Sequence, residues 1–123
     1  MNYNREELAW AAGLFDGEGS SFITFTRRRP WNRKCLVRSL SMKQNHISVL
    51  KRFYKAIGGL GSINGPYKYK YHKHAVYEWA TRKFEDVQAV IAMLWFKLDK
   101  IKRAQAKRML RGKARDRKLY HNF

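Results

Sequence analysis

The sequence is short of acidic residues. Its 123 residues include 9 Asp and Glu against 27 Lys and Arg, which gives a formal net charge of +18. An excess of this size goes well beyond what solubility requires and predicts a polyanionic partner. Nucleic acid is the leading candidate, because duplex phosphates lie about 1.7 Å apart along the axis and clustered cations release many counterions at once. An anionic membrane surface is the alternative.

Long apolar runs are also missing. The longest, Val87 to Leu98, is interrupted by Gln88 and Lys97 and is shorter than the roughly 18 residues that a membrane span requires. The first residues, MNYNREEL, lack the basic region and apolar run of a secretory signal. We therefore expect an intracellular protein with no membrane partner.

Cysteine is nearly absent. Cys35 is the only one, which excludes an intrachain disulfide and any multi-cysteine zinc site. His72 and His74 have the spacing of neighbours on one strand face, but they lack cysteine or nearby carboxylate partners. This favours contact with phosphate over zinc binding.

The sequence does contain alternating helix and hairpin patterns. Asn4 is a candidate N-cap for the first helix, and Gly17 and Gly19 are expected to end it. The full prediction is a helix over 5–16, a hairpin with strands over 20–29 and 35–43, a helix over 46–57, a second hairpin with strands containing 67–72 and 76–82, and helices over 84–94 and 98–110. A single domain over 1–111 with a basic tail over 112–123 is expected.

This order, αββαββα(α), predicts an α+β fold class with a curved four-stranded antiparallel sheet that helices cover on one face. The open face would meet DNA. A two-stranded ribbon fits the major groove, where Arg and Lys read guanine and Ser or Thr contacts bases or phosphates. The residues expected there are Ser20, Thr24, Thr26, Arg28, Ser39, Ser41, Lys43, Lys68, Lys70 and His72. The alternative is a merely solvated sheet face.

The first helix carries a stripe of small residues. Ala9, Gly13 and Gly17 recur at intervals of four, with Ala12 and Asp16 one step round the helix. Because Gly inside a helix costs about 1 kcal/mol relative to Ala, the stripe predicts close packing against another helix. We expect this helix to belong to a second copy of the chain, in a homodimer. A helix of the same chain is the alternative.

Two carboxylates end the same helix. The helix dipole opposes Asp16 and Glu18 there by about 0.3–1 kcal/mol, so stability does not account for them. Beside a basic groove, they would bind a hard divalent cation that also holds phosphate oxygens, which indicates metal-assisted phosphodiester hydrolysis. The alternative is that Asp16 caps a turn and Glu18 pairs with a Lys or Arg.

The segment AWAAGLFDGEGSSF, residues 9–22, resembles the LAGLIDADG motif of homing endonucleases, with Glu18 at its final acidic position. Residues 42–61 resemble the segment that follows the first hairpin of that family. KRAQA, residues 102–106, resembles its Lys-x-x-Gln-Ala helix. A single motif in a chain of this length implies, by analogy with the family, a homodimer with a near-palindromic DNA target.

The resemblance also implies roles for residues. Glu18 and the Gly17 carbonyl would hold Mg²⁺ or another divalent cation, while Gln44 and Lys102 would position water and stabilise the phosphate charge. Asp16 would be largely structural. A further basic residue often follows the glutamine in the family, and here NHISVLK leaves both His46 and Lys51 open. The implied protein is an intron-encoded nuclease that cuts across the minor groove and leaves 3′ overhangs.

Other functions are compatible with parts of the sequence. The same fold serves as an intron-RNA maturase or as a catalytically inactive DNA-binding protein, although Glu18, Gln44 and Lys102 together favour the nuclease. A ribosomal type of RNA-binding protein would account for the charge and for the alternating Tyr and Lys residues. It would not account for the acidic glycine turn.

Overall fold

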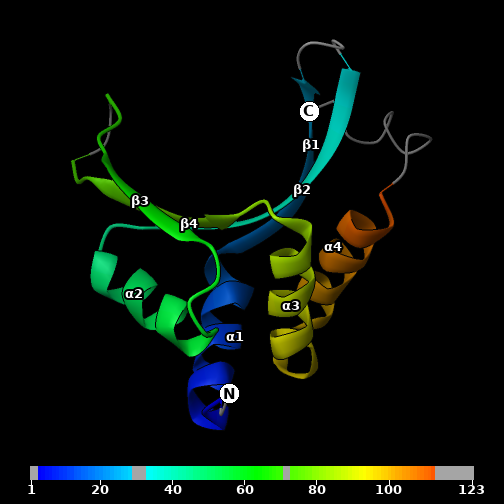
Figure 1. Ribbon diagram of the computed structural model, residues 1–123. Coiled ribbons are helices and arrows are strands. Elements are labelled where there is room, and N and C mark those ends of the chain that lie inside the picture. The colour runs from blue at the N-terminus through cyan, green and yellow to red at the C-terminus, as the bar shows by residue number, and fades with distance from the viewer. Residues whose placement is uncertain (1–2, 29–32, 71–72, 113–123) are drawn as a thin grey trace.

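The computed structural model describes residues 3–28, 33–70 and 73–112. His72 and residues 113–123 of the predicted tail therefore lie outside the described residues. The elements are α1 (Arg5–Glu18), β1 (Gly19–Arg28), β2 (Arg33–Gln44), α2 (Ile47–Ala56), β3 (Ser62–Tyr67), β4 (Val76–Thr81), α3 (Phe84–Leu94), the short 3-10 helix η1 (Trp95–Lys97) and α4 (Lys100–Arg111). This confirms the predicted order of helices and strands (Figure 1).

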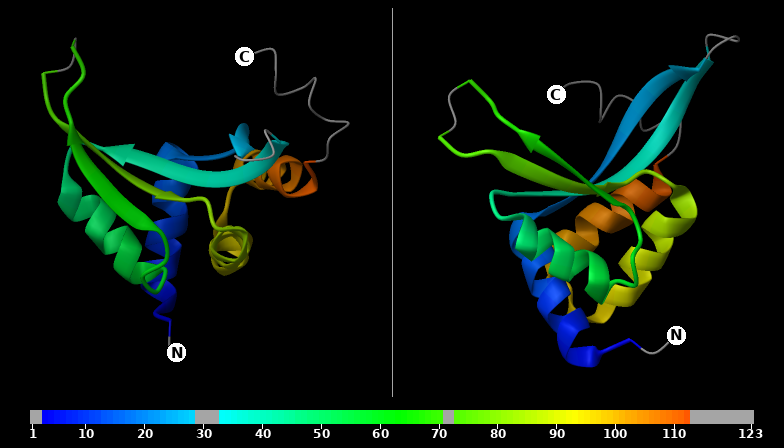
Figure 2. Two further views of the ribbon diagram at one scale, coloured as in Figure 1. Left: turned by 45° about the horizontal axis from the view of Figure 1, so that its top comes forward. Right: turned by 60° about the vertical axis from the view of Figure 1, so that its left-hand side comes forward.

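The four strands form one antiparallel sheet in the order β1-β2-β4-β3. The sheet is curved, and the helices lie on one face while the two hairpins rise on either side of the open face (Figures 1 and 2). This confirms the α+β class. Within the described ranges, the helices are too short or too polar to cross a membrane.

The first helix begins where the sequence predicts and ends slightly later. The Asn4 side chain accepts hydrogen bonds from the backbone N–H groups of Glu6 and Glu7, at 2.9 and 3.1 Å. The expected break at Gly17 is wrong, because α1 continues through it to Glu18. Gly19 ends the helix in extended backbone, where an added Cβ would lie 2.3 Å from Cδ2 of Phe15. The Phe15 ring therefore leaves room only for glycine at this point.

The first strand of the second hairpin also differs from the prediction. β3 covers Ser62–Tyr67 instead of 67–72, and it pairs through Ile63 with Trp79 of β4. Because Tyr67 already pairs with Val76, the first residue of β4, the described residues 68–70 and 73–75 have no strand partner. Lys68 and Lys70 are thus exposed but lie outside the sheet, and their predicted strand position is wrong.

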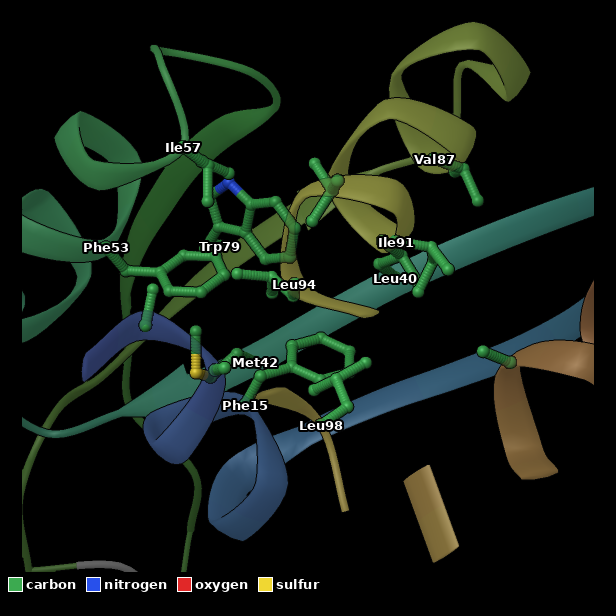
Figure 3. Close-up of a cluster of buried hydrophobic side chains, with 14 of the residues drawn as sticks. Phe15, Leu40, Met42, Phe53, Ile57, Trp79, Val87, Ile91, Leu94 and Leu98 are labelled. Atoms are coloured by element: carbon green, nitrogen blue, oxygen red, sulfur yellow. The ribbon is translucent and has the colours of Figure 1, made fainter. Parts of the chain in front are cut away.

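The core lies between the sheet and the helices. The Phe53 ring lies 6.5 Å from that of Phe15 and 4.8 Å from that of Trp79, measured between centroids. Met42 and Leu94 pack around these rings (Figure 3). Because Phe15 belongs to the last turn of α1, this cluster fixes the end of the helix against the sheet.

Arg52 connects α2 to the first half of α1. Its guanidinium donates two hydrogen bonds to the Glu7 carboxylate, at 3.0 and 3.1 Å, and lies 3.9 Å from the centroid of the Trp10 ring. The hydrogen bond from Arg52 holds the pKa of Glu7 below its ordinary value. The pair is exposed, so it orients the two helices more than it stabilises them.

Candidate active site

Glu18 is the last residue of α1, and its side chain is exposed. Because Gly19 pairs with Met42, the register places Glu18 beside Lys43 at the edge of the open sheet face. Among the described residues, the Glu18 carboxylate has no hydrogen bond or ion pair. The alternative in which a Lys or Arg neutralises Glu18 is therefore absent from the described structure.

Gln44, at the end of β2, shares a cavity with Glu18. Lys43 of the predicted DNA-binding set also lines this cavity, as do Asn45, Tyr69, Lys73, His74 and Val76. Neither His46 nor Lys51 is among the lining residues. The cations of the cavity instead come from Lys43 and from Lys73 in the β3–β4 connection, which sequence reasoning missed because its position depends on the register of the second hairpin.

Lys102 reaches the same turn from the first turn of α4. It is half-buried, and its Nζ donates a 2.5 Å hydrogen bond to the backbone carbonyl of Gly19. The structure thus brings Glu18, Gln44 and Lys102 together from three separate elements, around the junction of α1 and β1.

Asp16 lies only two residues before Glu18 in α1 but has a different environment. Its Oδ1 accepts a 2.9 Å hydrogen bond from the backbone N–H of Asp99, the N-cap residue of α4. Asp16 thus forms a hydrogen bond between two elements, whereas the alternative raised from the sequence was the capping of a turn. Asp16 thereby connects the end of α1 to the start of the helix that carries Lys102.

The stripe on α1 is exposed at three of its five predicted residues. Ala9, Gly13 and Gly17 are exposed, and a Cβ added at either glycine would meet no described atom within 4 Å. Ala12 is 0% exposed in the core of its own chain, so its predicted place in the dimer interface is wrong. Ala12 lies on the same side of α1 as Ala11 and Phe15, and this side of the helix faces the core.

The open sheet face carries most of the predicted polar residues. Ser20, Thr24 and Thr26 are exposed along β1, and Lys43 is exposed on β2. Ser41 is half-buried opposite Ser20. The side chain of Arg28 is not among those that the structure describes.

Ser39 departs from this pattern. It is 1% exposed, on an inner strand opposite Phe22, and its hydroxyl has no hydrogen-bond partner among the described residues. Phe22 and Val37 share the face and are half-buried. The prediction that Ser39 presents its hydroxyl to DNA is therefore not supported by its burial, and the face is less polar than expected.

The donors at the junction of α1 and β1 fit a cation whose remaining ligands come from other molecules. In the described part of the chain, His, Cys, Asp and Glu form no group of three or more that could hold a metal ion. One chain instead offers the Glu18 carboxylate, which is exposed and has no partner in the described part of the chain. Mg²⁺ is commonly bound in this way, through one or two carboxylates together with phosphate oxygens and water.

No protein family model matches this sequence, and no curated protein sequence matches it. Solved structures do match. The homing endonuclease I-CvuI, in complex with the I-CreI target in the presence of magnesium and with the DNA not cleaved, has a TM-score of 0.71 and 23% identity over 87% of this chain and 67% of its own. The LAGLIDADG homing endonuclease I-GzeII, in complex with its DNA target, has a TM-score of 0.68 and 18% identity. The LAGLIDADG meganuclease I-CpaMI, bound to uncleaved DNA, has a TM-score of 0.66 and 15% identity.

These similarities define the class of fold: the chain has the fold of the LAGLIDADG homing endonucleases. It aligns with 34% of I-GzeII and 35% of I-CpaMI. The chain therefore spans about one third of the length of these two proteins and about two thirds of I-CvuI.

Proposed function

We propose that two copies of this chain form a homing endonuclease, a divalent-metal-dependent enzyme that cleaves both strands of a specific DNA site by phosphodiester hydrolysis. The observation that carries the proposal is the convergence at the end of α1. There Glu18 is exposed and has no partner among the described residues, Gln44 lines the same cavity, and Lys102 donates to the backbone carbonyl of Gly19. The net charge of +18 and the DNA complexes of proteins with this fold support it.

Each residue that meets at the end of α1 has a chemical role in this proposal. Glu18 and the Gly17 carbonyl would hold Mg²⁺ or another divalent cation, which when bound neutralises phosphate charge and makes a water molecule more acidic. The Gln44 amide can both donate and accept, so it would orient the attacking water. Lys102 has two further N–H groups beyond the one that binds Gly19, and these would stabilise negative charge on the phosphate.

The exposed stripe would form the dimer interface. Ala9, Gly13 and Gly17 leave the backbone of α1 open to a second helix, and a two-fold axis there would place one Glu18 from each copy at the centre of the assembly. Each copy would then cut one strand. We propose a long, near-palindromic target, cut across the minor groove to leave 3′ overhangs.

DNA would bind along the open sheet face. Ser20, Thr24, Thr26 and Lys43 are exposed and would contact bases and phosphates. Lys68 and Lys70, beyond the end of β3, are better placed for phosphate contacts, which need charge but no fixed register. The contacts of Arg28 and His72 remain proposals from the sequence.

The substitution Glu18→Gln tests the proposal. The cognate site is first selected from a randomised DNA library with the wild-type protein. Glu18→Gln should then bind this site but cleave it at least about 100-fold more slowly in Mg²⁺, because it removes the anionic metal ligand. Glu85→Gln, which makes the same charge change at an exposed position on α3, is the matched control. Cleavage by Glu18→Gln at the wild-type rate would show that the assignment is wrong.

Intron RNA is a second candidate partner. Lys100, Lys107 and Arg111 are exposed on α4, and Phe96, just before that helix, is 88% exposed. Positive charge and exposed aromatic rings are both typical of surfaces that bind RNA. Splicing assays with purified protein and an intron transcript would show whether the chain promotes splicing as well as cleavage.

A further inference from the structure

Glu78 places a carboxylate on the open sheet face. It lies on β4 next to Trp79, whose side chain is fully buried in the core, so Glu78 points to the other face of the sheet. Its partner on β2 is Lys43, and its partner on β3 is Asn64. Because partners in an antiparallel pair share a face, the three side chains form one row across the surface that would meet DNA.

This carboxylate is unpaired. Among the described residues, Glu78 has neither a hydrogen bond nor an ion pair, even though Lys43 lies directly opposite. The Lys43 ammonium instead lies 5.6 Å from the centroid of the Tyr69 ring. A free carboxylate facing phosphates weakens binding through like-charge repulsion. Its presence therefore indicates a hydrogen-bond donor on the ligand.

The donors that DNA offers in the major groove are few. They are the N4 amino group of cytosine and the N6 amino group of adenine. Adenine also presents its N7 acceptor beside the amino group, which repels a carboxylate, whereas cytosine presents only the donor. The guanine paired with that cytosine offers the O6 and N7 acceptors, which suit a lysine.

We propose that Glu78 and Lys43 together read one G·C base pair, with Glu78 accepting from cytosine N4 and Lys43 donating to guanine O6 or N7. This rests on the proposed function. Side chains directly opposite in a sheet start about 4.5–5.5 Å apart at Cβ, which suits two adjacent base edges. Lys43 also lines both cavities that contain Glu18. The base pair therefore lies near the cleavage centre, once in each half-site.

Selection from a randomised DNA library tests this inference with the wild type, Glu78→Gln and Lys43→Gln. The wild type should require G·C at one position in each half-site. Glu78→Gln should change the preference at that position alone to A·T, by about 10-fold or more, because glutamine pairs with adenine N6 and N7. Lys43→Gln should relax the preference at the same position. Glu85→Gln should select the wild-type sequence.

The outcomes separate this inference from the proposed function. Circular dichroism melting first establishes that each variant is folded. If Glu78→Gln selects and cleaves the wild-type sequence, the base-reading role is overturned and the nuclease stands. If the two substitutions change different positions, the shared base pair is overturned. If the wild type selects no sequence, both proposals are overturned.

Discussion

The two faces of α1 are both lined by small residues, yet their surroundings are opposite. On the inner face, Ala11 and Ala12 are fully buried and let Phe15 enter the core beside the sheet. On the outer face, a Cβ at Gly13 or Gly17 would meet no atom of the described chain within 4 Å. Small side chains therefore bring α1 close to its own sheet on one side and leave its backbone accessible on the other.

Small residues therefore occur on the two faces of α1 for different reasons. Small residues on the inner face serve folding, since larger ones would overfill a packed core. On the outer face, two glycines lower helix stability without bringing α1 close to any other described part of the chain. Asp16 lies at the boundary, half-buried and bonded to Asp99. Single substitutions on α1 can thus test folding, positioning and association separately.

The largest effect on the stability of the chain is expected at the inner face. Phe15→Ala removes a ring that is 0% exposed and stacked on Phe53. The free energy of unfolding should fall by about 3–5 kcal/mol, a large part of the roughly 5–15 kcal/mol of a typical domain. Urea denaturation followed by circular dichroism measures it.

Phe96→Ala is the matched control for this prediction, because the Phe96 side chain is 88% exposed. Its free energy of unfolding should stay within about 0.5 kcal/mol of the wild type. If the two substitutions lower the free energy of unfolding equally, the packing of the inner face of α1 is not what stabilises the fold.

A smaller effect is expected at Asp16. Asp16→Ala removes the acceptor for the Asp99 N–H, and the lost hydrogen bond should lower stability by about 1 kcal/mol. Because the start of α4 carries Lys102, cleavage should fall about 10-fold or more while DNA affinity is retained. Asp16→Asn keeps the Oδ1 acceptor and should restore most of the rate. If Asp16→Asn is as slow as Asp16→Ala, then Asp16 acts through its charge, as a metal ligand would.

Local signals were sufficient for most of the fold. The limits of α3 agree with the predicted helix over 84–94, and Asn4 caps α1 as expected. β3 could not be predicted in this way, because its sequence SINGPY contains Asn, Gly and Pro, which are depleted in strands. It forms as an edge strand through pairing with β4. Proline is tolerated at such an edge.

The sequence proposes residues for the candidate site but does not indicate the contacts between them. The family resemblance supplied Glu18, Gln44 and Lys102. The bonds from Lys102 to Gly19 and from Asp99 to Asp16 each join residues 83 apart in the sequence, a distance that no local pattern indicates.

Two further positions show what periodicity can and cannot decide. Helical periodicity placed Ala12 beside Gly13 without showing which of them faces the sheet, and the packing of Phe15 decided it. For Glu78 a signal was present, since alternation with Trp79 along VYEWAT places it opposite the core.

Substitutions on the outer face of α1 should have the smallest effect on the free energy of unfolding and the largest effect on dimer formation. Gly13→Leu adds a side chain where a Cβ meets no atom of the described residues within 4 Å. The free energy of unfolding of the single chain should therefore rise by up to about 1 kcal/mol through better helix propensity. The same side chain would hold two α1 helices apart. Sedimentation should therefore give a monomer at concentrations where the wild type is a dimer.

Ala92→Leu is the control, because it enlarges an exposed position on α3 and should leave the dimer intact. A gain in chain stability together with a loss of association is a result that no substitution on the buried face can give, because there both properties depend on the same packed core. If Gly13→Leu remains dimeric, the outer stripe of α1 is not the interface, and the two Glu18 carboxylates must be brought to the DNA by another surface.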